Sequence, residues 1–219
     1  MKVTSMRLAL PLAIAVIVFG GAGRTCAAET AAVSKRDLAA KIEYCEICHG
    51  HSAEGFRAYY AIPRLAGQTP DFIKYALAAF VERRRTNNIM FHIASSLSPG
   101  MITGLAAHFH DLNPKPVGGG PTDLVAAGKK IYEEGVEPKG GGRIKVCGSC
   151  HGDDAKGDGE YPRLAGQLDD YIVDKLTNWG KEFGQNPGKM DLARMMQPIA
   201  EALTEAQIKA VAAYLSSLQ

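Results

Sequence analysis

The feature that most constrains this 219-residue chain is a five-residue motif that occurs twice. Cys45 begins the segment Cys-Glu-Ile-Cys-His, and Cys147, 102 positions later, begins Cys-Gly-Ser-Cys-His. Two cysteines three apart with histidine directly after the second form a rare pattern in a chain with five cysteines and six histidines. Two copies of it indicate a repeated chemical site around which the chain is built.

Both motifs have the spacing of a covalent attachment site for haem c. Thiols three residues apart on one turn can both reach the vinyl groups at one edge of a porphyrin and form thioethers. The next residue then lies beneath the ring, where its imidazole binds the iron. We therefore expect two covalently attached haem c groups, with thioethers from Cys45, Cys48, Cys147 and Cys150 and with His49 and His151 as iron ligands.

The N-terminal segment is typical of a secretory signal peptide. Basic residues precede an apolar run at 8–19, which is too short to span a bilayer comfortably, and small residues follow as far as Ala28. We expect residues 1–28 to be cleaved off together with Cys26, which makes the mature protein periplasmic. An uncleaved membrane anchor and a lipoprotein acylated at Cys26 are the alternatives.

Other uses of the remaining four cysteines fit the sequence less well. Two disulfides are the default for an exported chain, but they leave the two adjacent histidines unexplained. A zinc site made of all four cysteines would want its pairs much closer than 102 residues. A thioredoxin-like redox motif would want a βαβ context, which the sequence lacks.

The two motifs belong to an internal duplication. The hexapeptide Pro-Arg-Leu-Ala-Gly-Gln occurs at 63–68 and again at 162–167, and helical patterns with expected N-caps at Thr69 and Asp169 follow. A stretch rich in proline and glycine separates the copies. The predicted organisation is a signal peptide at 1–28, a first haem domain at 29–112, a linker at 113–121 and a second haem domain at 122–219.

Every predicted element is a helix, because no segment alternates strongly enough to indicate a strand. We therefore expect an all-α fold. Each copy has a first helix, starting near Ser34 or Thr122, then the haem motif, a helix after the glutamine, a loop with methionine and a final helix. Aromatic residues make up only 7% of the chain, so a buried porphyrin would supply apolar bulk that such small domains lack.

The repeat also selects the second iron ligands, for which methionine is usual in c-type cytochromes. Met90 stands seven residues before Leu97, and Met196 stands seven residues before the equivalent Leu203. We therefore expect Met90 and Met196 to bind the iron of the first and second haem.

Other residues compete for these positions. Met195 is the nearest competitor, because a loop could slip by one residue, whereas Met190 and Met101 lie further out of register. His92 could replace Met90, but its repeat partner is Pro198, which cannot bind iron. We expect His92 to be a surface or lightly packed residue.

Two pairs in the repeated hexapeptide could support the haem groups. The carbonyls of Pro63 and Pro162 could accept the Nδ1 protons of the two motif histidines, or the prolines could only shape the loop. Arg64 and Arg163 could pair with haem propionates, or they could be solvated.

The charge balance gives no indication of a polyanion partner. The chain has 25 basic and 23 acidic residues, so we expect no nucleic-acid partner, and docking of a protein partner would depend on local patches. One candidate patch is 83–85, which is Arg-Arg-Arg. A second consists of Asp153, Asp154, Asp158 and Glu160. Either could instead be an ordinary solvated face.

With these motifs together, the chain resembles the dihaem cytochrome c4 family, in which two class I cytochrome c domains follow each other. The resemblance rests on both Cys-x-x-Cys-His motifs with their following glycines, both hexapeptides, and both methionines ahead of a Leu-Ser or Leu-Thr helix start. It covers nearly all of 34–219. One departure is arginine at 64 and 163, where the family usually has lysine in the second segment.

The resemblance implies hydrogen bonds from the axial histidines to the two prolines, and a pseudo-twofold pairing of the domains with the haems near their interface. It also implies electron delivery from a quinol-oxidising complex to a terminal oxidase. Iron bound by both histidine and methionine has no open position, so we expect an electron-transfer protein and not an enzyme.

Two other functions stay open at this point. The chain could be the cytochrome subunit that relays electrons from a sulfide, thiosulfate or alcohol dehydrogenase. A dihaem peroxidase is a further alternative, but it needs an iron that can lose its second ligand, and a methionine is present in each copy. The expected partners are redox proteins, and a loose association with a membrane surface also stays open.

Overall fold

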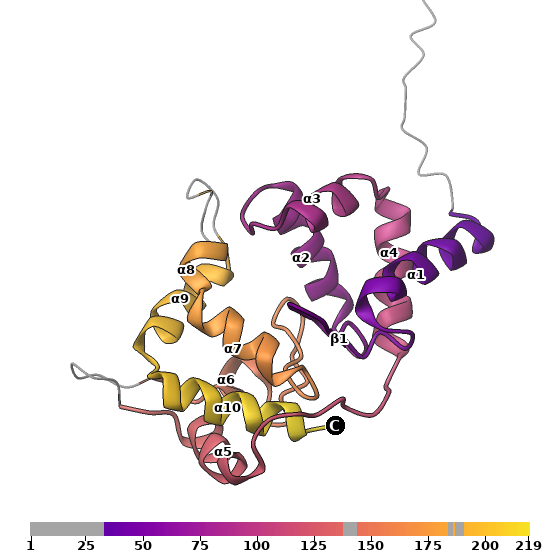
Figure 1. Cartoon of the computed structure of the whole chain (residues 1–219). Coiled ribbons are helices and arrows are strands. Elements are labelled where there is room, and N and C mark those ends of the chain that lie inside the picture. Colours follow the sequence, from indigo (N-terminus) through magenta and orange to yellow (C-terminus); the bar gives the residue numbers. More distant parts are fainter. Residues whose placement is uncertain (1–32, 138–143, 184–185, 187–190) are drawn as a thin grey trace, which may run out of the picture. The chain divides into compact units, whose positions relative to one another are not determined.

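The structure is a computed structural model that describes residues 33–137, 144–183, 186 and 191–219. The predicted signal peptide, residues 138–143 of the insertion before the second haem motif, and Met190 lie outside the described residues. Helices dominate what is described, which confirms the predicted all-α class (Figure 1).

The first copy contains four helices and one small hairpin among its described residues. Its elements are α1 (Lys35–His49), β1 (Phe56–Arg57), β2 (Ala61–Ile62), α2 (Pro70–Val81), α3 (Asn88–Ser95) and α4 (Pro99–Asp111). The hairpin corrects the expectation of no strands: β1 and β2 are antiparallel, with Phe56 opposite Ile62 and Arg57 opposite Ala61. Strands of two residues are too short to show an alternating pattern in the sequence.

The second copy has the same succession of main helices, but its first helix is divided, a short helix follows the helix after its hexapeptide, and its described residues form no named strand. Its elements are η1 (Thr122–Leu124), α5 (Val125–Glu134), α6 (Gly148–His151), α7 (Asp169–Thr177), α8 (Trp179–Glu182), α9 (Ala193–Ala202) and α10 (Glu205–Ser217). In the described residues no single helix is long and apolar enough to cross a membrane, and only the bent pair α3 and α4, at 116°, passes by length and composition.

Helix starts follow the predicted capping chemistry in most places. The hydroxyls of Ser34 and Thr69 accept the backbone N–H groups of Asp37 and Phe72. The predicted cap at Asp169 is wrong, because Leu168 holds that position and the Asp169 carboxylate instead lies 2.5 Å from the Arg57 guanidinium. An ion pair with the first copy therefore replaces the local cap.

Each copy has its own hydrophobic core. In the first copy the core joins α2 and α4 and includes Ile73, Leu105 and Phe109, and in the second it joins α5, α7 and α10 and includes Tyr132 and Val211. Two separate cores agree with the predicted pair of haem domains, whose boundaries stay a prediction.

In both copies, the first and last helices meet at a glycine. In the second copy α5 and α10 touch so closely at Gly128 that a Cβ there would lie 1.9 Å from the carbonyl oxygen of Ala210. In the first copy the glycine is on the other helix, because Gly104 of α4 faces the side chain of Leu38 on α1. The same helix crossing therefore occurs in both copies. The glycine lies on the last helix in the first copy and on the first helix in the second copy.

The two copies are joined by a reciprocal exchange of buried hydrogen bonds. Gln68 accepts the backbone N–H of Arg163 (3.0 Å) and donates to the carbonyl of the same residue (2.7 Å). Gln167 makes the same two bonds with Arg64, at 2.8 and 3.1 Å. Each glutamine amide therefore satisfies a buried backbone N–H and C=O of the other copy, and the symmetry is that of the implied pseudo-twofold pairing.

A second junction uses the arginines that follow α2. The Arg85 side chain donates to Glu182 (2.7 Å) and to the Tyr171 hydroxyl (2.8 Å), and the Thr86 N–H donates to the Glu182 carbonyl (2.8 Å). Arg84 is also buried. The prediction of a docking patch at 83–85 is therefore wrong for its last two arginines, whose charges are paired inside the protein.

Candidate haem-binding sites

In the first copy, the motif occupies the last turn of α1. A single helix carries Cys45, Cys48 and His49. It ends after His49 because Gly50 adopts φ +90°. Any other residue would be strained at this φ, and its Cβ would lie 3.0 Å from the backbone oxygen of Gly55, so the tight turn requires glycine. The helix therefore holds both thiols and the imidazole on one rigid element.

The His49 ring is oriented by a proline carbonyl. Its Nδ1 lies 2.8 Å from the carbonyl oxygen of Pro63, and since that oxygen can only accept, Nδ1 carries the proton. The lone pair of Nε2 is then available to a metal. Burial lowers the pKa of His49 against the opposing effect of the Pro63 hydrogen bond, and the charge of Arg85 lowers it further. The imidazole is therefore held in the neutral form that binds iron.

The second copy reproduces this arrangement. His151 is buried at the end of α6, and its Nδ1 lies 3.0 Å from the carbonyl oxygen of Pro162. Burial lowers the pKa of His151 while the Pro162 hydrogen bond opposes the shift. The predicted hydrogen bonds between the motif histidines and the two prolines are thus confirmed in both copies.

The insertion accounts for the main difference between the copies. Gly135, at φ +74°, ends α5, and Val136 pairs with Ile144 in an antiparallel bridge that brings the chain back to the helix end. The N–H of Cys147 then donates to the carbonyl of Tyr132 in α5 (3.0 Å). The second motif is therefore attached to its first helix across an insertion, whereas the first motif is part of the helix itself.

The four motif cysteines form no disulfide with one another. Burial raises the pKa of Cys45 to about 11 and also raises that of Cys147. Across the described ranges, no three His, Cys, Asp or Glu side chains are grouped to hold a metal ion, so the cysteines are not assembled as a zinc site.

The prediction that the methionines lie in loops is wrong, because both lie on helices, where they are half-buried. Met90 is in the first turn of α3, where its N–H donates to the Asn87 side chain (2.9 Å). Met196 is on α9, whereas its competitor Met195 is 55% exposed on the same helix. The repeat register, in which Met196 matches Met90, therefore remains the ground for choosing Met196.

The other candidate ligands are occupied elsewhere or exposed. Met101 packs against the first core from α4, as predicted from its place in the last helix. His92 is exposed and contacts Phe91 edge-on. Neither residue therefore competes with Met90 on the structure.

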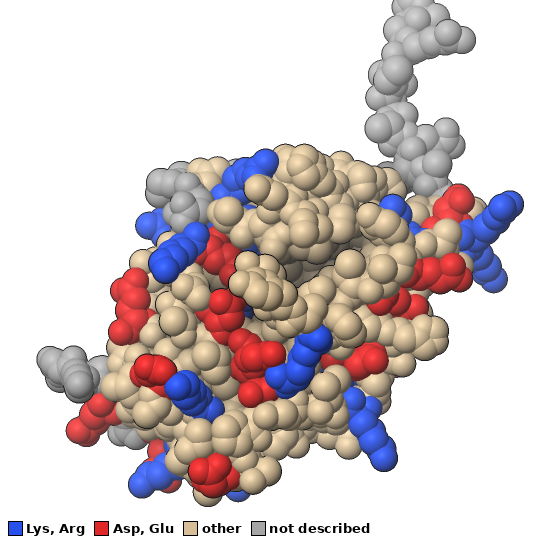
Figure 2. Space-filling view, viewed as in Figure 1, with Lys and Arg blue, Asp and Glu red and all other residues tan. Residues whose placement is uncertain are grey.

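The described residues fit haem c in both copies. Each copy supplies two cysteine thiols, a neutral imidazole with Nε2 available, and a half-buried thioether. Figure 2 shows a hollow in the surface of the first copy beside α2, bordered mainly by uncharged residues. This is the donor set that a covalently bound haem requires.

Comparison with known proteins establishes the family. A family model described as cytochrome c matches residues 125–219. Cytochrome c-552 of Acidithiobacillus ferridurans is 36% identical over 179 residues, which are 80% of this chain and 73% of that protein. The solved structure of Acidithiobacillus ferrooxidans cytochrome c4 is also 36% identical, with a TM-score of 0.65 over 80% of this chain and 99% of that one. The chain belongs to the dihaem cytochrome c4 family.

As a member of the dihaem cytochrome c4 family, the chain binds two haem c groups covalently and is an electron-transfer protein, not an enzyme. A further relative has a more specific name. The thiosulfate dehydrogenase electron acceptor of Thiomonas intermedia is 35% identical over 177 residues, which are 79% of this chain and 77% of that protein.

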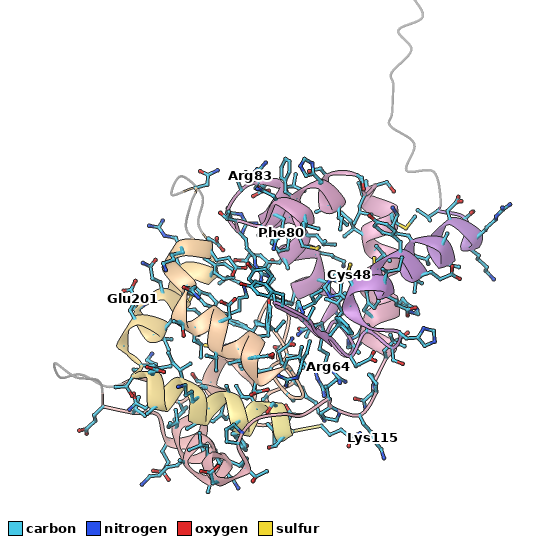
Figure 3. All side chains as sticks on the ribbon, viewed as in Figure 1. Cys48, Arg64, Phe80, Arg83, Lys115 and Glu201 are labelled. Carbon is cyan, nitrogen blue, oxygen red and sulfur yellow. The ribbon has the colours of Figure 1, made fainter. Side chains whose placement is uncertain are left out.

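In this chain the hexapeptide arginines are buried. Arg64, which Figure 3 labels, is 2% exposed, and its guanidinium donates to the carbonyls of Ala66 (2.9 Å) and of Pro114 in the linker (3.0 and 3.1 Å). Burial, followed by the charge of Arg163, lowers the pKa of Arg64 to about 10. Arg163 makes the equivalent bond to Ala165 (3.0 Å). The solvated alternative is therefore wrong for both, and propionate pairing stays a prediction.

Sequence reasoning missed the residues that join the two haem domains. Gln68 and Gln167 could have been found, because they end the repeated hexapeptide and a repeated polar residue needs a reason. Tyr75, Arg84 and Asp191 also join the copies, but they have no equivalents in the repeat that would have marked them.

Proposed function

We propose that this chain carries single electrons in the periplasm, from a quinol-oxidising complex to a terminal oxidase. In this proposal the chain is exported by its signal peptide, 1–28, and has haem domains at 29–112 and 122–219 with a linker at 113–121. The thioethers come from Cys45, Cys48, Cys147 and Cys150, and the iron ligands are His49, Met90, His151 and Met196.

The observation that carries the proposal is the fixed, neutral histidine of each copy. When bound, haem c supplies one-electron redox chemistry at its iron. His49 and His151 each present Nε2 in one orientation because a proline carbonyl holds Nδ1. A half-buried methionine in the same repeat position of each copy supplies the second ligand. With both positions filled, no site is left for a substrate, which supports a carrier over a peroxidase.

A second function has a specific finding in its favour. The 35% identity with the Thiomonas intermedia protein supports a role as the electron acceptor of a thiosulfate dehydrogenase. In that role the chain would receive electrons from a catalytic partner, and the same two sites would pass them on. The two functions differ only in the donor, so the donor has to be tested directly.

The test follows the oxidation state of the purified holoprotein with each partner. We expect bacterial membranes that contain a terminal oxidase to reoxidise the reduced protein, and we expect cyanide to stop this. We also expect quinol and membranes to reduce the oxidised protein. Reduction by thiosulfate and its dehydrogenase alone would contradict the respiratory route and establish the second function. A high-spin ferric haem with hydrogen peroxide turnover would contradict both.

A further inference from the structure

Asp191 is a buried carboxylate at the start of the helix that carries Met196. It is 6% exposed, and its Oδ1 accepts the N–H of Ala193, the first residue of α9, at 3.1 Å. A negative charge at this end of a helix is stabilising, because the first N–H groups have no partner within the helix. Asp191 therefore caps α9 from just outside it.

The groups that hold this carboxylate come from the first copy. The Tyr75 hydroxyl, on α2, donates to Asp191 Oδ1 and accepts the N–H of Ala193 at 3.2 Å. Burial, followed by the hydrogen bond to Asp191, raises the pKa of Tyr75 to about 12, so the phenol stays protonated and remains a donor. One side chain of the first copy thus contacts both the cap and the first turn of α9.

Arg84 supplies the charge that a buried carboxylate needs. Its Nη1 lies 3.2 Å from Asp191 Oδ1, in ion-pair range but without the alignment of a hydrogen bond. Its guanidinium lies 4.9 Å from the centre of the Tyr75 ring, and its Nε donates to Glu82 at 2.8 Å. The half-buried Tyr75 and the buried Arg84 and Asp191 form one cluster, which we call the cap clamp.

In the first copy, the cap of the methionine helix does not depend on the other copy. Its methionine helix, α3, is capped by its own Asn87, whose side chain accepts the N–H of Met90 directly. In the second copy Ala193 stands at the repeat position of Asn87 and has no side-chain acceptor. The cap of α9 therefore has to come from elsewhere, and its geometry depends on the first copy.

We infer that Tyr75 and Arg84 of the first copy are positioning residues for Met196, the proposed iron ligand of the second copy. They act through Asp191, which fixes the first turn of α9. That turn ends at Met196, so it sets the direction of the Met196 side chain. The strength of iron ligation in the second copy, and hence its reduction potential, is then set in part by the first copy.

The test replaces Tyr75 by phenylalanine in the holoprotein, which removes one hydroxyl and keeps the ring beneath Arg84. We expect the amide of Ala193 to exchange hydrogen about fivefold faster, as for the loss of one hydrogen bond. We expect the midpoint potential of the second haem to fall while that of the first is unchanged. Tyr171→Phe is the matched control, since it removes a hydroxyl at the same interface that contacts Arg85 instead.

Further variants separate positioning from general stability. Asp191→Asn keeps an oxygen acceptor and should retain most of the second haem's potential, whereas Asp191→Ala should lower it more than Tyr75→Phe does. Unchanged exchange at Ala193 in Tyr75→Phe would overturn the inference, as would equal shifts of both potentials or the same shift in Tyr171→Phe. The ligand itself is tested separately, because a wrong assignment of Met196 shows in Met196→Ala and not in the exchange rates.

Discussion

Replacing Met196 by alanine is expected to abolish the sulfur-to-iron charge-transfer absorption of the second haem and to leave that of the first intact. Alanine has no donor atom, so the iron of the second copy loses its thioether ligand. About half of the total charge-transfer intensity should disappear, since each of two haems contributes one methionine. The potential of the second haem should fall as well, because an axial methionine favours the reduced state. Absorption spectra and a redox titration of the ferric holoprotein measure both effects.

Met195→Ala is the matched control for this variant. Met195 is the neighbouring residue of the same helix and is 55% exposed, so its removal should leave the spectrum and both potentials unchanged. Loss of the signal in Met195→Ala, with both signals retained in Met196→Ala, would show that the ligand is one residue earlier. Met90→Ala should remove the signal of the first haem in the same way.

Gly128→Ala is expected to destabilise the second copy by about 3 kcal/mol or more, at the upper end of what overpacking costs. The added methyl would lie 1.9 Å from the Ala210 carbonyl oxygen, which is backbone and cannot rotate away. Helices α5 and α10 would have to separate, although alanine itself favours a helix over glycine by about 1 kcal/mol. Guanidinium unfolding followed by fluorescence measures this, because Trp179 is the only tryptophan of the chain and lies in the second copy.

Gly104→Ala provides the comparison at the equivalent crossing. Its methyl would lie 3.0 Å from the two Cδ atoms of Leu38, the far end of a flexible side chain that can move. We therefore expect a loss of about 1 kcal/mol or less in the first copy. Equal losses in the two variants, measured by far-ultraviolet circular dichroism, which reports the helices of both copies, would contradict the close backbone contact at Gly128.

The sequence was sufficient for the parts of the fold that are repeated within it. The helices after each hexapeptide and the final helices follow from residues that occur twice, and the bond from each motif histidine to its proline follows from the family resemblance. Repetition works as evidence here because two copies of one site need the same local contacts. The family resemblance rests on the same residues.

What the sequence could not show are the contacts between the copies. Aspartate is a residue type common at helix N-caps, yet Asp169 pairs with Arg57 of the first copy. A run of arginines is typical of an exposed basic patch. Arg84 and Arg85 instead form buried ion pairs with Asp191 and Glu182 of the second copy. Each is a contact across about 100 positions that only the packing of the copies creates, so local patterns carry no sign of it.

The most direct test of the central claim is a pyridine haemochrome assay combined with the intact mass of the exported protein. The spectrum should report two haem c groups per chain, and the mass should equal that of a chain that begins near Glu29 plus two haems. Cys48→Ala and Cys150→Ala should each affect the attachment of one haem only. One haem per chain, or none, would contradict the claim that both motifs are haem sites.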